Sequence, residues 1–260
     1  MSLSYEEYGN TNGPLIVWIH GGGVSGWMWN EQVQYFRSYH NIIPTLSEHG
    51  MNNNGIPFSI QSSAEHILRL IEEKANRKKV IVVGFSLGAQ ITLQILSLKP
   101  ELIDVAIVNS ALTRPQPFMK KLLRPMVDLS YPLIKQKWFA KLQSKFLYIH
   151  EKDFHTYYQE SLQLTKESLI RVLNENMSFT LPTGFRHAKT KILVTVGEKE
   201  RSIMKKSAKE IVSSNENCTG ILIPNIGHGV SLAKPDFFNQ LVEQWITDST
   251  LLEECIKFYP

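Results

Sequence analysis

Apolar residues recur along the chain in short continuous runs, separated by stretches of mixed polarity. A run of this kind is typical of a β-strand that is covered on both faces. The runs occupy residues 14–19, 79–83, 105–108, 191–196 and 220–224. Between them, residues 61–76 place Ile67, Leu68, Leu70 and Ile71 on one side of a predicted helix. The pattern therefore predicts alternating strands and helices, as in an α/β domain.

Two weaker patterns add to this alternation near the N-terminus. Residues 2–8 alternate weakly between polar and apolar side chains, which predicts an edge strand, and Ile42 and Ile43 predict a short strand. A chain of 260 residues with 43% hydrophobic content can form one large α/β domain or two small ones. We expect one compact domain with an insertion.

The insertion is predicted over residues 113–188, where helical patterns and scattered prolines break the alternation. Between Arg114 and Lys152, nine Lys or Arg stand against two acidic residues, interleaved with apolar side chains such as Phe118 and Trp138. The simpler interpretation is an apolar face turned inward and basic side chains in water. The alternative hypothesis is peripheral contact of this basic segment with lipid headgroups, or attraction of anionic substrates.

Charge and cysteine content exclude several classes of protein. The net charge of +4, from 28 basic and 24 acidic residues, is too small and dispersed to predict nucleic-acid binding. Residues 80–98 are uncharged, but two Gln and several hydroxyls favour a buried strand and helix over a transmembrane segment. No signal peptide is predicted from an N-terminus with Glu6 and Glu7, and only Cys218 and Cys255 occur, which fits a reducing cytoplasm.

Neither a metal nor a cofactor is predicted. His150, Asp153 and His155 form the one weak candidate for a metal cluster, and side chains in contact with water explain their spacing better.

The strongest chemical signal is Gly84-Phe85-Ser86-Leu87-Gly88, where an apolar run meets a helical pattern. This strand-turn-helix setting is the one that the G-x-S-x-G nucleophile elbow requires. A serine at such a turn projects its hydroxyl away from the sheet, provided that the flanking residues lack bulk. We therefore predict Ser86 as a nucleophile.

An oxyanion hole is predicted upstream, where the run 14–19 leads into His20-Gly21-Gly22-Gly23. Three glycines allow the backbone to turn and expose N–H groups. The N–H of Gly22, helped by Gly23, would pair with that of Leu87 to stabilise a negative oxygen. His20, at a strand end, is interpreted as a buried structural histidine.

The general base and the acid are predicted downstream of Ser86. His228 lies in a glycine-flanked loop after the run 220–224, a setting that none of the other seven histidines has. Glu198 and Glu200 follow the run 191–196, and an acid three residues past Gly197 suits this loop best. We favour Glu200, while the choice between the two glutamates depends on geometry.

With these motifs in Ser, acid, His order, the chain resembles the α/β-hydrolase superfamily over nearly all its length. The resemblance rests on residues 20–23, Trp29, residues 84–88, residues 197–200 and Gly227-His228, and is closest to esterases and lipases with a helical cap. It implies a mostly parallel eight-stranded sheet flanked by helices. It also implies a core of residues 1–112 and 189–260, with residues 113–188 as a cap over the active site.

The chain departs from the family pattern at two places. The acid is Glu where Asp is commoner. In residues 44–50, Thr45 and Glu48 replace an Asp and a Gly of the usual family segment, which predicts the loss of a turn contact and an altered loop.

The resemblance implies a serine hydrolase that cleaves carboxylic esters of small molecules through an acyl-enzyme on Ser86. Carbon-carbon bond hydrolysis and cofactor-free haloperoxidase chemistry use the same residues and stay open. So does a signalling receptor that binds a small ligand with slow or no turnover. The substrate pocket is predicted to include Gly23, Trp27, Phe85, Phe118 and Trp138.

Overall fold

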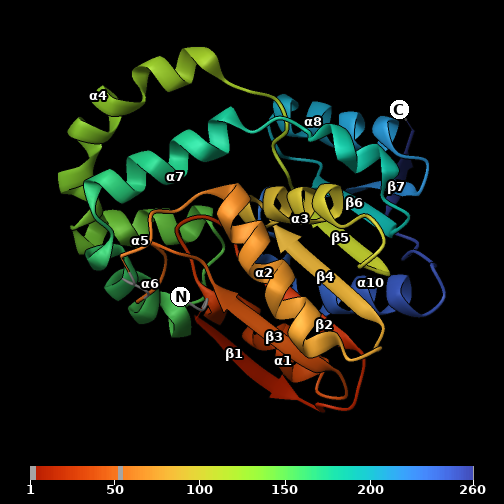
Figure 1. Cartoon of the computed structure of the whole chain (residues 1–260). Helices are drawn as coiled ribbons and strands as arrows, with labels where there is room; N and C mark the ends of the chain where they lie inside the picture. Colours follow the sequence, from red (N-terminus) through yellow and green to blue (C-terminus); the bar gives the residue numbers. More distant parts are fainter. Residues whose placement is uncertain (1–3, 52–54, 260) are drawn as a thin grey trace.

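One eight-stranded sheet forms the centre of the computed structural model, which describes residues 4–51 and 55–259 (Figure 1). The strands follow the spatial order β1-β3-β2-β4-β5-β6-β7-β8, and only the edge strands β1 and β8 pair antiparallel with their neighbours. The strands are β1 (Ser4–Gly9), β2 (Leu15–Ile19), β3 (His40–Thr45), β4 (Val80–Phe85), β5 (Val105–Asn109), β6 (Lys191–Gly197), β7 (Cys218–Ile223) and β8 (Ile256–Phe258). The predicted mostly parallel eight-stranded sheet is confirmed.

Helices cover both faces of this sheet. They are α1 (Asn30–Tyr35), α2 (Ile60–Ala75), α3 (Leu87–Leu98), α4 (Pro117–Ile134), α5 (Lys137–Phe146), α6 (Glu151–Gln163), α7 (Lys166–Ser178), α8 (Ser202–Ser214), α9 (Val230–Ala233) and α10 (Pro235–Thr247), with short 3₁₀ turns η1 (Gly26–Trp29) and η2 (Thr183–His187). The uncharged run 80–98 forms β4 and α3, as predicted. Across the described ranges, no helix combines the length and apolar character needed to cross a bilayer.

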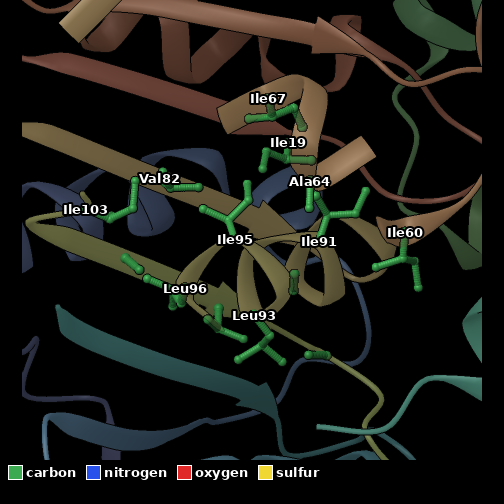
Figure 2. Packing of buried hydrophobic residues seen from close by; sticks show 14 of the residues in the cluster. Ile19, Ile60, Ala64, Ile67, Val82, Ile91, Leu93, Ile95, Leu96 and Ile103 are labelled. Carbon is green, nitrogen blue, oxygen red and sulfur yellow. The ribbon is translucent and has the colours of Figure 1, made fainter. Parts of the chain in front are cut away.

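The apolar runs are continuous because each central strand is covered on both sides. In β2, Leu15, Val17 and Ile19 face one core cluster, whereas Ile16 and Trp18 face the other. Successive side chains of a strand point to opposite faces, so a strand between two cores needs apolar residues at every position. Figure 2 shows the first cluster, in which Ile19 and Val82 pack against residues of α2 and α3.

The edge strands carry weaker signals for the same reason. β1 is mostly exposed, and β8 has only three residues with little burial, so neither needs a continuous apolar run. The predicted strand over residues 2–8 corresponds to β1, while Ser2 and Leu3 of that prediction lie outside the described residues.

Between β5 and β6 the chain forms α4 to α7, which lie together on the side of the molecule toward which β4 points (Figure 1). α4 packs along α7, and α5 packs against α6. Pro125 and Pro132 lie inside α4, where each lacks a backbone N–H for the helical ladder. The division of the chain at residues 113 and 188 stays a prediction, and these four helices all fall between its limits.

Candidate functional site

Ser86 occupies the turn between β4 and α3 in a strained backbone conformation. Its φ of 53° and ψ of −110° place a non-glycine residue in a region that costs about 1–3 kcal/mol. Its N–H donates to the carbonyl of Asn109 at 2.8 Å, which fixes the turn to β5. This is the local geometry of a nucleophile elbow, with the serine at the start of a helix.

Two glycines allow the elbow to pack this tightly. A Cβ on Gly88 would lie 2.2 Å from the carbonyl oxygen of Ile19, and a Cβ on Gly84 would lie 2.4 Å from the carbonyl oxygen of Gly88. Neither contact is tolerable for a real side chain. The spacing of glycines about Ser86 therefore follows from the close approach of α3 to β2 and β4.

Glu200 is buried after β6 and holds the ring of His228. Its Oε2 lies 2.8 Å from His228 Nδ1, and its Oε1 accepts hydrogen bonds from Ser110 Oγ at 2.6 Å and the N–H of Gly197 at 3.0 Å. Burial alone would raise the pKa of the Glu200 carboxyl. Hydrogen bonds from His228, Ser110 and Gly197, with the charge interaction with His228, outweigh burial and keep that pKa below its usual value.

Glu198 points elsewhere. Glu198 is exposed, and its Oε2 accepts a hydrogen bond of 2.8 Å from the N–H of Asn225, in the loop that leads to His228. Of the two glutamates considered from the sequence, Glu200 is thus the one that contacts the imidazole.

Ser110 is a part of this arrangement that the sequence reasoning missed. Asn109 and Ser110, at the end of β5, carry no carboxylate and match none of the motifs that predict the site. Ser110 instead adopts a φ of 58° and donates to Glu200, while Asn109 Nδ2 donates to Thr195 Oγ1 at 2.5 Å. The available signal was position, because β5 and β6 are parallel neighbours and their carboxyl ends lie side by side.

His228 and Ser86 line one cavity of about 330 Å³, together with Glu200 and Asn176. The ring of Phe85 packs against the imidazole with a centroid distance of 4.8 Å, and about a third of the His228 side chain is exposed. Within the described ranges, no hydrogen bond joins Ser86 Oγ to His228. Such bonds are often long in enzymes without substrate and shorten when it binds.

Gly22 and Leu87 line a second cavity together with Ser86. Leu87 is the first residue of α3, and the N–H groups of a helix's first turn have no acceptor within the helix. The candidate oxyanion donors and the candidate nucleophile are therefore brought together. Gly23 has a φ of 76° and lines the same cavity.

His20 is a buried residue that contacts the first glycine of the turn at residues 21–23. It is fully buried, its Nδ1 contacts the carbonyl oxygen of Gly21 at 2.8 Å, and its Nε2 accepts the N–H of Leu46 at 3.1 Å. The proton therefore resides on Nδ1. Burial, with a smaller contribution from His49, lowers the pKa of His20 to about 3, so the imidazole is neutral and structural, as the sequence indicates.

We expect His20 to make the free energy of unfolding depend on pH. The folded chain keeps a neutral ring, whereas the unfolded chain takes up a proton below about pH 6.5, so stability falls as the pH falls from about 6.5 toward 3. In His20→Gln this dependence should weaken by about 1 kcal/mol per pH unit between about pH 6 and 5. Urea unfolding across this range measures the slope, and an unchanged slope in the variant would contradict the assignment.

The cavity beside Gly22 has a volume of about 290 Å³ and a mainly apolar wall. α4 to α7 and their connections provide most of it, through Ile134, Gln143, Leu147, Tyr157, Ser161, Leu164, Leu169, Val172, Leu173 and Asn176. A smaller cavity of about 90 Å³ shares His49 and Leu164 with it and is bordered by Glu48 and Glu160. The smaller cavity is thus the more polar of the two, although apolar surface predominates in both.

The five predicted pocket residues have different positions. Gly23 lines both of these cavities. Trp27 donates from Nε1 to Glu160 Oε2 at 2.9 Å, and Phe85 is buried against His228. Phe118 is 71% exposed and Trp138 is 61% exposed, on the outer sides of α4 and α5, which differs from the expectation that they line the pocket.

Glu48 fixes the loop at residues 44–50, where the sequence departs from the family pattern. It adopts a φ of 60°, the conformation that a glycine takes readily. Its carboxylate accepts hydrogen bonds from the N–H of Phe58, from Ser168 Oγ and from Arg171 Nε, at 2.9 to 3.0 Å. The replacement of glycine therefore connects this loop to α7.

Asn176 is fixed between the two larger cavities by the buried Gln90 of α3. Gln90 Nε2 donates to the carbonyl of Asn176 at 3.0 Å, and Asn176 Nδ2 donates to Gln90 Oε1 at 3.0 Å. This pair of bonds holds the end of α7 near Ser86.

The part of the chain that the structure describes brings no three His, Cys, Asp or Glu side chains together as a possible metal-ligand cluster.

Comparison with known proteins identifies a family for the chain and solved structures with the same fold. A model of the alpha/beta hydrolase family matches residues 16–241. The (E)-2-((N-methylformamido)methylene)succinate hydrolase of Acinetobacter baylyi is 23% identical over 252 residues, covering 93% of each chain. Two solved structures, an esterase from Exiguobacterium antarcticum and the enol-lactonase from Burkholderia xenovorans LB400, are 15% and 14% identical with TM-scores of 0.78. Each match covers 95% of this chain and 96% of the other, and at this identity the likeness shows the fold.

Proposed function

The chain belongs to the alpha/beta hydrolase family, and from this premise we propose that it is a serine hydrolase that cleaves carboxylic esters of small molecules. The observation that carries the proposal is the hydrogen bond of 2.8 Å between Glu200 Oε2 and His228 Nδ1, at a cavity that Ser86 also lines. An imidazole whose Nδ1 proton is held by a carboxylate presents a free Nε2 as a general base.

The reaction has two halves. Ser86 Oγ attacks the ester carbonyl while His228 Nε2 takes its proton, and the N–H groups of Gly22 and Leu87 stabilise the negative oxygen. The C–O bond to the alcohol then breaks, and the proton on His228 passes to the departing oxygen. A water molecule, deprotonated by His228, attacks the acyl-enzyme and releases the acid with Ser86 restored.

The acyl group is assigned to the 290 Å³ cavity, because its wall is mainly apolar and begins at Ser86 and Gly22. In this reading residues 113–188 act as the cap, since α4 to α7 supply most of that wall. Solved structures of the same fold, named as an esterase and an enol-lactonase, support the hydrolysis of an ester carbonyl.

We also propose that the protein acts in the cytoplasm, because its two cysteines, Cys218 and Cys255, are free thiols.

A covalent label tests the assignment of the nucleophile. A fluorophosphonate should react so that the P–F bond breaks, fluoride leaves and a bond forms between phosphorus and Ser86 Oγ. Mass spectrometry of the digested protein should find the adduct on the peptide that contains Ser86. The adduct should be lost in Ser86→Ala and kept in Ser213→Ala, whose serine is exposed on α8. A label on any other residue, or none, would refute the proposal.

A further inference from the structure

Large apolar side chains are exposed on α4 and α5 in an unusual concentration. Of the fourteen large hydrophobic residues that are exposed in the described parts of the chain, eight lie on these two helices, with exposed fractions from 39% to 81%. They are Phe118, Leu122, Met126, Leu129, Leu133, Trp138, Leu142 and Phe146, which we call the outer apolar set. Contiguous exposed apolar surface commonly marks an interaction site.

The spacing of these residues places them in stripes. On α4 they recur after four, four, three and four positions, which at 3.6 residues per turn confines them to an arc of about 80°. On α5, Trp138, Leu142 and Phe146 recur every four positions. Leu123 and Val127 lie on a different side of α4 and are buried, and α4 packs along α7. α4 thus has one apolar side turned inward and another turned to solvent.

The charged residues of this segment are almost all basic. α4, α5 and the two residues between them hold seven Lys or Arg and one acid, Asp128, which pairs with Lys166. Within the described residues, Lys141 pairs with Glu151, and Lys135 donates to backbone carbonyl groups of residues 161–164. The other five cations have no acidic partner within 4.0 Å in the described parts of the chain. They are Lys120, Lys121, Arg124, Lys137 and Lys145, which we call the basic set. On α5, Lys137, Lys141 and Lys145 each precede one residue of the apolar stripe.

We propose that the outer apolar set and the basic set of α4 and α5 form a docking surface for a bilayer with anionic headgroups. Apolar side chains on one side of a helix enter the boundary between headgroups and acyl chains, while the long Lys and Arg side chains of its polar side extend to the lipid phosphates. Charge complementarity selects this partner. A protein surface that covered the stripes would have to supply acidic groups for five unpaired cations, whereas an anionic leaflet offers them everywhere.

The same helices also border the cavity beside Ser86. The cavity is lined by Ile134 of α4, by Gln143 of α5 and by Leu147, which directly follows α5. Docking through α4 and α5 therefore places a wall of this cavity at the lipid surface. The docking itself does not depend on the proposed hydrolysis.

Sedimentation with vesicles tests the surface. We compare vesicles of phosphatidylcholine alone with vesicles of phosphatidylcholine and phosphatidylglycerol, using the full chain and also Ser86→Ala to separate binding from turnover. Both proteins should partition at least about tenfold more strongly onto the anionic vesicles, and added salt should weaken the binding. Inorganic phosphate at matched ionic strength should displace no more protein than chloride does, because a lipid surface is the partner.

Three variants identify the residues responsible. Lys120→Gln, Lys121→Gln and Arg124→Gln together should lower the partition coefficient at least about tenfold, and so should Leu129→Ser, Trp138→Ser and Phe146→Ser together. The control combines Lys99→Gln, Lys189→Gln and Lys257→Gln, which removes the same charge from exposed positions off α4 and α5 and should bind as the unmodified chain does. Circular dichroism confirms that each variant is folded.

Three results would overturn the proposal. They are equal partition onto the two kinds of vesicle, an equal loss of binding in the control variant, and absence of vesicle binding. If the apolar variant instead converts a dimer to a monomer in sedimentation equilibrium while vesicle binding is absent, the surface is an interface between two copies. Ester hydrolysis with failed docking would refute this surface alone, and docking without hydrolysis would refute the proposed function alone.

Discussion

Replacing Ser86 with alanine is expected to lower kcat for ester hydrolysis by about 10⁴-fold or more, with little change in KM. The side chain removed is the group that we propose forms the acyl-enzyme, whereas the apolar cavity and the N–H groups of Gly22 and Leu87 stay in place. The remaining activity would come from binding and from stabilisation of the oxyanion alone. A series of p-nitrophenyl esters with acyl chains of increasing length measures both constants.

Ser213→Ala is the matched control, because it removes the same hydroxyl from an exposed site on α8 and should retain full turnover. If Ser86→Ala and the unmodified chain hydrolyse every ester equally slowly, the assignment as an ester hydrolase is wrong. The alternative of a small-ligand receptor with this fold would then be favoured.

The core of the fold could be predicted from the sequence because its constraints are local and strict. β2 and β4 are buried on both faces, so every position must be apolar, and the run identifies the strand. The elbow at Ser86 needs Gly84 and Gly88 within five residues, since a Cβ at either would meet backbone. Constraints of this kind leave a readable pattern in a single sequence.

The wall of the apolar cavity could not be predicted in this way. α4 carries apolar residues on two adjacent sides, and the pattern does not say which side packs inward. Phe118 and Trp138 were expected at the pocket and are exposed, whereas Tyr157 and Leu173 line it and were not singled out. The choice depends on how α4 packs along α7 and α5 against α6, which is a property of the tertiary structure.

Contacts between distant residues were predictable where neighbouring strands bring their ends together. Glu200 and His228 follow β6 and β7, which are parallel neighbours, so the order of motifs predicted an acid of the first loop beside His228. The choice of Glu200 over Glu198 depended on the geometry of that loop. The bond from Ser110 to Glu200 and the contacts of Glu48 with α7 required the actual backbone conformations, with φ values of 58° and 60°. A sequence pattern contains no direct signal for a positive φ at a serine or a glutamate.

Replacing Glu200 with glutamine is expected to lower kcat by about 10³- to 10⁴-fold, while KM changes little. The reason is the fixed set of donors about the carboxylate. Ser110 Oγ and the N–H of Gly197 both donate to Oε1, so the carbonyl oxygen of the glutamine side chain should occupy that position. Its NH₂ group then faces His228 Nδ1, which must become an acceptor.

In that tautomer the proton moves to His228 Nε2, which can no longer take a proton from Ser86, so the loss should appear in kcat. Glu198→Gln provides the control. Among the described residues, the Glu198 side chain accepts one hydrogen bond, from the N–H of Asn225, and a glutamine oxygen can accept it as well, so turnover should stay near that of the unmodified chain. The reverse result, a large loss in Glu198→Gln and none in Glu200→Gln, would assign the acid to Glu198. It would also show that the hydrogen bond at His228 has no catalytic role.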